Sequence, residues 1–205
     1  MKQQRWLETA RTLYSLSQAG LAYSQNPFDV ERYKQLQRIS AEIVSDHTNL
    51  ATDEIENVFS LQAGYPTPKV DVRAALVENG QILMVRELSD GNWSMPGGWA
   101  DLGDSPARVA ERETFEESGY VVKALKLVGV FNNSLIQPLD FYHAYKLVFL
   151  CQRESGEPRP SYESLEVAWQ PIDCLPALST NRTPRRVLDE VLEHIANPAR
   201  ESYFE

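Results

Sequence analysis

The chain has 205 residues, of which 42% are hydrophobic and 24% charged, and its formal net charge is -9. This composition is ordinary for a folded globular protein and excludes a disordered or collagen-like chain, while the acidic surface disfavours binding to duplex DNA. Two cysteines are too few for a disulfide framework, so we expect Cys151 and Cys174 to be reduced and buried. No apolar run approaches the roughly 18 residues of a membrane span, and the first residues are too polar for a signal peptide. We therefore expect a cytoplasmic protein without a membrane partner.

Residues 1–62 carry the pattern of a small all-helical N-terminal domain. Apolar side chains recur at helical spacing over 6–21 and again over 33–44. Asn26–Pro27 lies between these stretches, where Asn can cap the second helix and Pro can occupy its first position. A third, short helix is predicted over 52–61. Because apolar stripes on short helices need a partner surface, we expect this domain to serve dimerisation or packing.

A linker and a change of pattern follow. Residues 63–69 contain two prolines and a glycine, which cannot continue a helix, and residues 70–205 form the predicted second domain. Apolar runs over 70–77 and 81–86 flank Asn79–Gly80, which predicts a β-hairpin. Further strands are predicted over 125–131, 141–151 and 167–169, and helices over 105–118 and 184–195. Strands with intervening helices indicate an α/β or α+β domain.

The segment 96–119 combines a glycine-rich loop with a predicted helix. Two glycines directly after Pro96 allow the loop backbone to approach a ligand or an ion closely. Ser105–Pro106 is typical of a helix start, and Gly119 is well placed to end the helix.

Three glutamates share one face of that helix, at positions i, i+3 and i+4: Glu113, Glu116 and Glu117. Carboxylates so close together repel each other. The pattern is stable if they are solvated, if Arg108 or Arg112 offsets their charge, or if they bind a hard cation. Mg²⁺ prefers oxygen ligands and commonly bridges to substrate phosphates. For the glutamates alone a solvated helix face is the usual explanation, and the glycine loop at a fixed distance before the helix adds weight to a cation site.

This segment resembles the signature of the Nudix hydrolases, which is a glycine, five residues, an acidic residue, seven residues, then Arg-Glu-x-x-Glu-Glu-x-Gly. The matching residues are Gly98, Asp104, Arg112, Glu113, Glu116, Glu117 and Gly119. Asp104 replaces the usual Glu, and Thr114 stands where an aliphatic residue is usual. The resemblance covers nearly the whole chain, because the helical extension is typical of a subgroup that includes CDP-choline and ADP-ribose pyrophosphatases. It implies a Nudix α/β/α sandwich for the second domain.

The resemblance also implies a metal-assisted hydrolysis of a nucleoside diphosphate linked to another group. Mg²⁺ or Mn²⁺ would neutralise the diphosphate and lower the pKa of an attacking water. The implied metal ligands are Glu113, Glu116, Glu117 and the backbone carbonyl of Gly97. We call the segment that carries this signature, residues 98–119, the Nudix box. The residues expected to shape it are Gly98, Asp104, Arg112 and Gly119.

Further site residues are expected from the same resemblance. Glu116 is a candidate catalytic carboxylate as well as a ligand. A second one, acting as a base or an extra ligand, would come from a later loop, where the candidates are Glu154, Glu157, Glu163 and Glu166. We favour Glu163 for its spacing of six residues before Trp169, with a solvated loop residue as the alternative. Arg73 and Arg86 occupy strand positions that can direct a guanidinium to phosphate; the alternative is an exposed strand arginine.

Several functions are compatible with these residues, because the signature recognises the diphosphate and the metal and not the attached group. CDP-choline is the first candidate substrate. ADP-ribose or another nucleotide sugar is the alternative. A non-catalytic, metabolite-binding Nudix regulator is a third reading, against which the intact carboxylate set argues. The resemblance further favours a homodimer.

Overall fold

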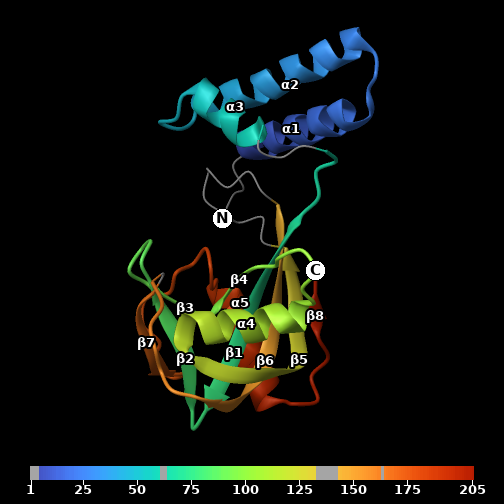
Figure 1. The fold of residues 1–205 in the computed structure, drawn as a ribbon. Coiled ribbons are helices and arrows are strands. Elements are labelled where there is room, and N and C mark those ends of the chain that lie inside the picture. The colour runs from blue at the N-terminus through green and yellow to red at the C-terminus, as the bar shows by residue number, and fades with distance from the viewer. Residues whose placement is uncertain (1–4, 61–63, 133–142, 163) are drawn as a thin grey trace. The chain divides into compact units, whose positions relative to one another are not determined.

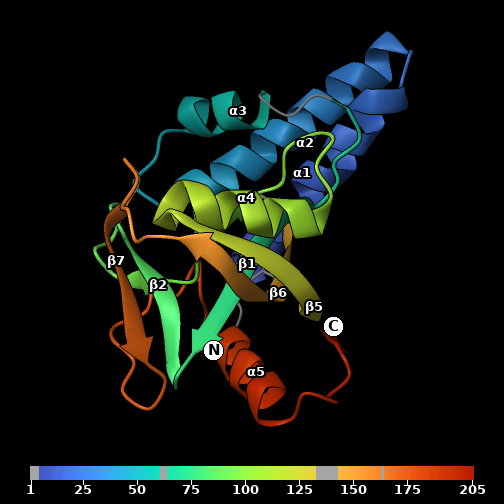
Figure 2. The ribbon, with the colours of Figure 1, turned by 60° about the horizontal axis from the view of Figure 1, so that its bottom comes forward.

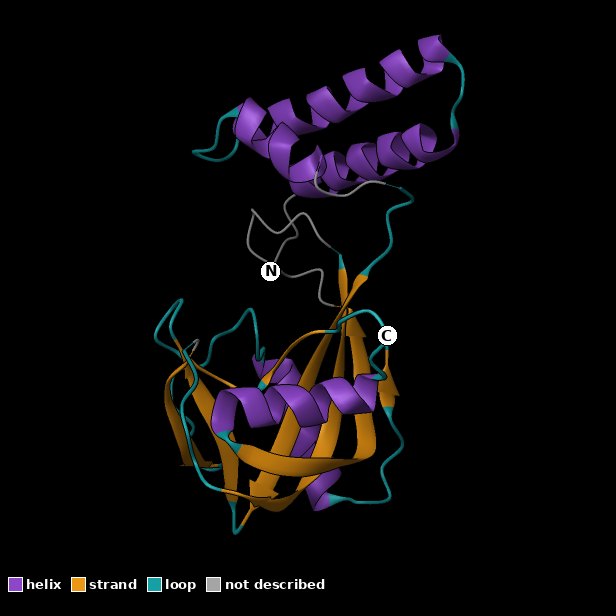
Figure 3. Ribbon diagram, in the orientation of Figure 1, coloured by secondary structure: helices purple, strands orange, loops and turns teal. Residues whose placement is uncertain are grey.

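The computed structural model describes residues 5–60, 64–132, 143–162 and 164–205, which divide into two compact units before and after the Thr67–Pro68 boundary. The helices are α1 (Arg5–Tyr23), α2 (Pro27–Ser45), α3 (Thr52–Ser60), α4 (Pro106–Ser118) and α5 (Arg185–Ala196). The strands are β1 (Lys69–Glu78), β2 (Gln81–Glu87), β3 (Trp93–Ser94), β4 (Gly97–Trp99), β5 (Tyr120–Asn132), β6 (Ala144–Gly156), β7 (Ser164–Pro171) and β8 (Tyr203–Phe204) (Figures 1 and 3). None of the helices in the described ranges is long and apolar enough to cross a membrane. The predicted domain limits at 62 and 70 stay a prediction.

The described residues of the first unit form three helices, as predicted. The Asn26 side chain accepts a hydrogen bond from the Phe28 N–H at 2.9 Å, and Pro27 occupies the first position of α2. This capping satisfies a backbone donor that would otherwise be unpaired at the start of the helix. The core of the unit is formed by Leu7, Ala10, Tyr14, Ala41, Val44, Ile55 and Phe59.

The second unit is built on a mixed sheet whose described strands follow the order β3-β2-β1-β6-β5-β8, with β4 paired to β1 and β7 paired to β2. The hairpin between β1 and β2 turns at Asn79–Gly80, where both residues have positive φ, as the sequence predicts. Strand β6 lies parallel to β1 and antiparallel to β5. These pairings place β1 near the middle of the sheet.

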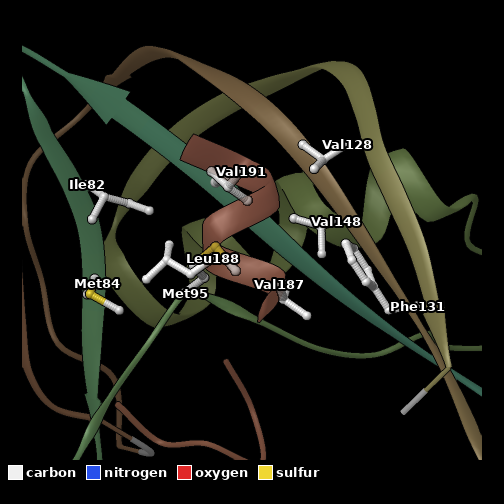
Figure 4. Packing of buried hydrophobic residues seen from close by; sticks show 10 residues of the cluster. Ile82, Met84, Met95, Val128, Phe131, Val148, Val187, Leu188 and Val191 are labelled. Carbon is white, nitrogen blue, oxygen red and sulfur yellow. The ribbon is translucent and has the colours of Figure 1, made fainter. Parts of the chain in front are cut away.

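The two faces of the sheet are covered by different helices, as Figure 2 shows for α4 and α5. Alternate residues of β1 point to opposite faces. Ala74 and Leu76 pack with Val109 and Ala110 of α4, whereas Ala75 belongs to the cluster around α5. Figure 4 shows the α5 side chains Val187, Leu188 and Val191 at the centre of that second cluster. The second unit is therefore the expected α/β/α sandwich.

One expectation about the cysteines is wrong. Both are free, and Cys151 is buried in β6 as expected, but Cys174 is exposed. Cys174 follows β7 in a turn, where the chain has left the sheet and offers its side chain no packed face.

Candidate functional site

Helix α4 begins and ends where the sequence predicts. The Ser105 hydroxyl accepts a hydrogen bond from the Arg108 N–H at 3.4 Å, and Pro106 is the first helical residue. Gly119 ends the helix in the left-handed conformation, with φ 79°, and a Cβ there would lie 2.5 Å from the Glu157 carbonyl oxygen. Both ends of the helix that carries the three glutamates are thus fixed by local chemistry.

Glu117 is the most deeply buried of these glutamates, with 7% of its surface exposed. Its Oε2 accepts a hydrogen bond from the Gly97 N–H at 2.9 Å. Burial raises the pKa of Glu117 to about 7, although the charge of Arg73 and the hydrogen bond from Gly97 both work against the rise. The positive charge near this carboxylate is therefore too small to offset the cost of burying its negative charge.

Arg112 donates hydrogen bonds to three other acidic side chains of the Nudix box. Its Nη1 donates to Glu113 Oε1 at 2.9 Å and to Glu116 Oε2 at 3.0 Å. Its Nε donates to Asp104 Oδ2 at 3.1 Å, so the shorter acidic side chain still reaches the arginine. Burial raises the pKa of Glu113 despite the opposing charge of Arg112. Arg112 thereby holds two glutamates of α4 and the preceding loop in one network.

The glycine loop lies directly against both β1 and the glutamates. In β4, Gly97 and Gly98 pair with Arg73 and Val72 of β1. Gly97 has φ 142°, and a Cβ there would lie 2.0 Å from the Val72 carbonyl oxygen. A Cβ on Gly98 would lie 2.8 Å from Glu113 Oε2. The first glycine is therefore needed for the backbone path, and the second leaves space for a carboxylate.

The substitution Gly98→Ala tests this division of roles. We expect the variant to fold, because its Cβ meets only the end of the Glu113 side chain, which can move. We expect its affinity for Mn²⁺ to fall about 10- to 100-fold, as for other residues that position metal ligands. Titration with Mn²⁺ followed by electron paramagnetic resonance measures the affinity. Gly97→Ala should instead disrupt folding, because its Cβ meets backbone. Unchanged Mn²⁺ affinity in Gly98→Ala would contradict the assignment.

A buried charge network underlies the loop, and Arg73 is the only one of its members that the sequence predicted as a site residue. Asp71 accepts hydrogen bonds from Arg73 Nε at 2.9 Å and from Lys146 Nζ at 2.7 Å. Arg73 Nη1 also donates to the Met95 carbonyl oxygen at 3.3 Å. Burial opposes ionisation of Asp71, but the charges of Arg73 and Lys146 outweigh it and hold its pKa below the usual value. Charged residues inside the apolar runs 70–77 and 144–151 are the feature of the sequence that could have indicated this network.

The structure places the other predicted site residues differently. Arg86 is exposed, its Nε donates to the Gly91 carbonyl oxygen at 2.9 Å, and its Nη1 lies 3.9 Å from Glu166 Oε2. Arg73 is buried, and its guanidinium is occupied by Asp71 and Met95. Glu163 lies outside the described residues.

The donor set fits a hard divalent cation, because it consists of carboxylates and includes a buried glutamate that lacks sufficient positive charge. The carboxylates are not pre-assembled as ligands. Among the residues that the structure describes, no three His, Cys, Asp or Glu side chains come together as a metal site. Glu113 and Glu116 instead share Arg112 as an ion-pair partner.

Comparison with known proteins decides the family. Residues 67–191 match the family described as the NUDIX domain. The chain belongs to the Nudix family. Residues 4–59 match the family described as "UDP-X-like, N-terminal oligomerisation domain". The resemblance in the sequence is thus confirmed for both parts of this Nudix hydrolase.

Two of the relatives of this Nudix hydrolase match it over essentially its whole length, and a third matches about two thirds of it. A Bacillus subtilis (strain 168) protein named "Putative ADP-ribose pyrophosphatase YjhB" is 36% identical over 204 residues, which are 99% of this chain and 98% of that protein. The crystal structure of a UDP-X diphosphatase covers 100% of both chains with 29% identity and a TM-score of 0.63. That of an ADP-ribose pyrophosphatase from Streptococcus suis 89-1591 covers 68% of this chain and 100% of its own, with 32% identity and a TM-score of 0.61. The chain is a Nudix pyrophosphohydrolase that acts on nucleoside diphosphate derivatives.

We expect the metal affinity of this enzyme to depend on pH, because a proton on Glu117 would compete with a cation bound there. The raised pKa of about 7 means that Glu117 in the metal-free protein is protonated below neutrality and charged above it. We expect Mn²⁺ to bind about tenfold more weakly at pH 6 than at pH 8. Calorimetric titration in two buffers of different ionisation enthalpy would also detect the released proton. Equal affinity at both pH values would contradict a raised pKa.

Proposed function

We propose that the chain hydrolyses the diphosphate bond of its substrate with Mg²⁺ or Mn²⁺ held by Glu113, Glu116, Glu117 and the carbonyl of Gly97. The single observation that carries this proposal is the buried, charge-deficient carboxylate of Glu117 beside the Gly97 N–H, on the same helix face as two further glutamates. When bound, the metal neutralises the diphosphate and lowers the pKa of an attacking water.

The residues around the metal have separate tasks in this proposal. The Gly97 N–H orients Glu117, and Arg112 orients Glu113 and Glu116. The Glu116 side chain is 54% exposed, so it is accessible to solvent and suited to accept the proton of the attacking water. Glu163 is the second candidate for that proton.

ADP-ribose is the substrate that we propose first, ahead of the CDP-choline favoured by the sequence alone. Two relatives with at least 32% identity carry ADP-ribose pyrophosphatase in their names. A UDP-linked group is the second candidate, because the N-terminal family and the full-length structural relative are both described by UDP-X. The Nudix box does not distinguish between ADP-ribose, CDP-choline and a UDP-linked group, since it contacts the diphosphate and the metal in each case.

A substrate panel tests this choice. The full-length chain is assayed with ADP-ribose, UDP-glucose, CDP-choline and ATP at equal concentration, each with Mg²⁺, with Mn²⁺ and with EDTA. We expect the highest kcat/KM for ADP-ribose and no turnover in EDTA. A higher value for UDP-glucose or CDP-choline would replace the substrate but keep the reaction. Tight binding of ADP-ribose without turnover of any compound would instead support the regulator.

We also propose that the first unit joins two chains into a homodimer. Its helices bury one apolar core and still expose further large apolar side chains, with Leu16 61%, Tyr23 75% and Phe28 70% exposed. Light scattering coupled to size-exclusion chromatography should give a dimer mass for the wild type and a lower mass for Leu16→Ser/Phe28→Ser. A monomeric wild type would contradict the proposal.

A further inference from the structure

The segment 177–183, which lies between β7 and α5, is fastened to β3 and to the loop that leads into the glycines. The Trp93 N–H donates to the Ala177 carbonyl at 2.9 Å, and the Ser179 N–H donates to the Trp93 carbonyl at 2.8 Å. At the other end of the segment, the buried Thr183 hydroxyl accepts a hydrogen bond from the Met95 N–H at 2.9 Å. The segment is therefore held within two residues of Gly97.

Arg182 in this segment is held on one side only. Its Nε lies 3.2 Å from Glu87 Oε2. The Glu87 side chain is 4% exposed, and its other oxygen accepts a hydrogen bond from the Ser94 hydroxyl, so this carboxylate is a fixed support. Within the described residues Glu87 is its one ion-pair partner, while the charge of Arg182 also helps to lower the pKa of Asp90; 37% of the Arg182 side chain is exposed. More than a third of the side chain is thus accessible to a solute.

Glu87, the ion-pair partner of Arg182, lies close enough to Glu117 of α4 for its charge to act on that carboxylate. The negative charge of Glu87 contributes to the raised pKa of Glu117. The positive charge of Arg182, after burial and Arg73, contributes to lowering the pKa of Lys146 to about 8. Arg182 and Glu87 are therefore close enough to both groups for their charges to act there.

Accessibility separates the three cations of this neighbourhood. The side chains of Arg73 and Lys146 are 4% and 0% exposed, and both are paired with Asp71. Arg73 is further occupied by the Met95 carbonyl, and its stem would lie 3.0 Å from a Cβ on Gly97. Arg73 therefore supports the loop from beneath, and of the three cations Arg182 alone has a substantial exposed surface.

We propose that Arg182, oriented by Glu87, binds a phosphate of the substrate's diphosphate, and that Arg73 is a positioning residue of the glycine loop. A guanidinium presents two parallel donors that match two phosphate oxygens. An acidic chain needs such a local cation to bind a polyanion that the metal neutralises only in part. This inference rests on the proposed function, because it assigns a contact to the same substrate.

The decisive comparison uses Arg182→Gln and the double variant Glu87→Gln/Arg182→Gln. The double variant matters because Arg182→Gln alone leaves Glu87 buried without its cation, which by itself lowers stability. We expect both variants to raise KM for ADP-ribose about 10- to 100-fold while kcat changes less than about threefold. Calorimetry with the same variants should show a parallel loss of affinity for ADP in the presence of Mg²⁺.

Arg185→Gln serves as the matched control, because it removes an arginine three residues away whose partner is Asp189 on the same helix. Its KM should equal that of the wild type. If the double variant regains the wild-type KM and ADP affinity, Arg182 serves only to neutralise Glu87 and the inference is wrong. If Glu117→Gln turns over normally, the proposed function fails and the inference falls with it. An inactive Glu117→Gln together with an unchanged KM in the double variant overturns the Arg182 assignment alone.

Discussion

Replacing Glu117 by Gln should lower kcat by at least about 1,000-fold, because the variant keeps the shape of the side chain but loses the charge that we propose binds the metal. The carboxamide oxygen can still accept the hydrogen bond from the Gly97 N–H, so the loop keeps its place. The variant also removes a buried charge that is short of positive partners, so the free energy of unfolding in the absence of metal should not fall. Steady-state kinetics with ADP-ribose and Mg²⁺ measures the first effect, and chemical denaturation measures the second.

Glu111→Gln is the matched control on the same helix. Glu111 lies outside the three-glutamate face, where its Oε1 accepts hydrogen bonds from Lys123 Nζ at 2.9 Å and from the Ala124 N–H at 3.2 Å. Its kcat should stay within about twofold of the wild type, because an exposed ion pair contributes little and does not touch the site. Near-wild-type kcat in Glu117→Gln would contradict the metal assignment.

The largest effect on stability should come from Asp71→Asn. This change leaves Arg73 and Lys146 facing each other in the interior without their shared carboxylate. Breaking a buried ion pair on one side costs roughly 3 to 5 kcal/mol, and we expect a loss of that size in the free energy of unfolding. Denaturation followed by near-ultraviolet circular dichroism of the full-length chain measures it.

A second ion pair between the same two strands provides the comparison. Glu78 of β1 and Arg153 of β6 lie 2.8 Å apart, with side chains 30% and 39% exposed. Glu78→Gln should cost less than about 1 kcal/mol, because solvent replaces the lost partner. Lys146→Met added to Asp71→Asn should recover part of the lost stability by removing one of the two cations. Equal stability of Asp71→Asn and Glu78→Gln would show that the buried network does not stabilise the fold.

Local signals in the sequence predicted most of the elements. The Asn26 and Ser105 caps, the Gly119 helix end and the Asn79–Gly80 turn all act within a few residues of the chain, and the structure confirms each. The family signature could be found in the same way, because Gly98 and Glu117 lie on one continuous segment. Local chemistry was sufficient wherever the partners are close in sequence.

Long-range contacts could not be predicted in this manner. Strand β4 has three residues and forms because β1 lies beside it, so no periodicity indicates it. Lys146 meets Asp71 across 75 positions through the parallel pairing of β1 and β6. Arg182 reaches Glu87 through a segment whose docking depends on backbone hydrogen bonds to Trp93. A lone charge in an apolar strand indicates such a partner but does not identify it.

We propose that carboxylates of α4 support metal-dependent cleavage of a diphosphate bond. Phosphorus nuclear magnetic resonance of ADP-ribose incubated with the full-length chain tests it most directly. We expect AMP and ribose 5-phosphate in equal amounts when Mg²⁺ or Mn²⁺ is present, and unchanged ADP-ribose when EDTA replaces the metal. The same cleavage at the same rate in EDTA would contradict it.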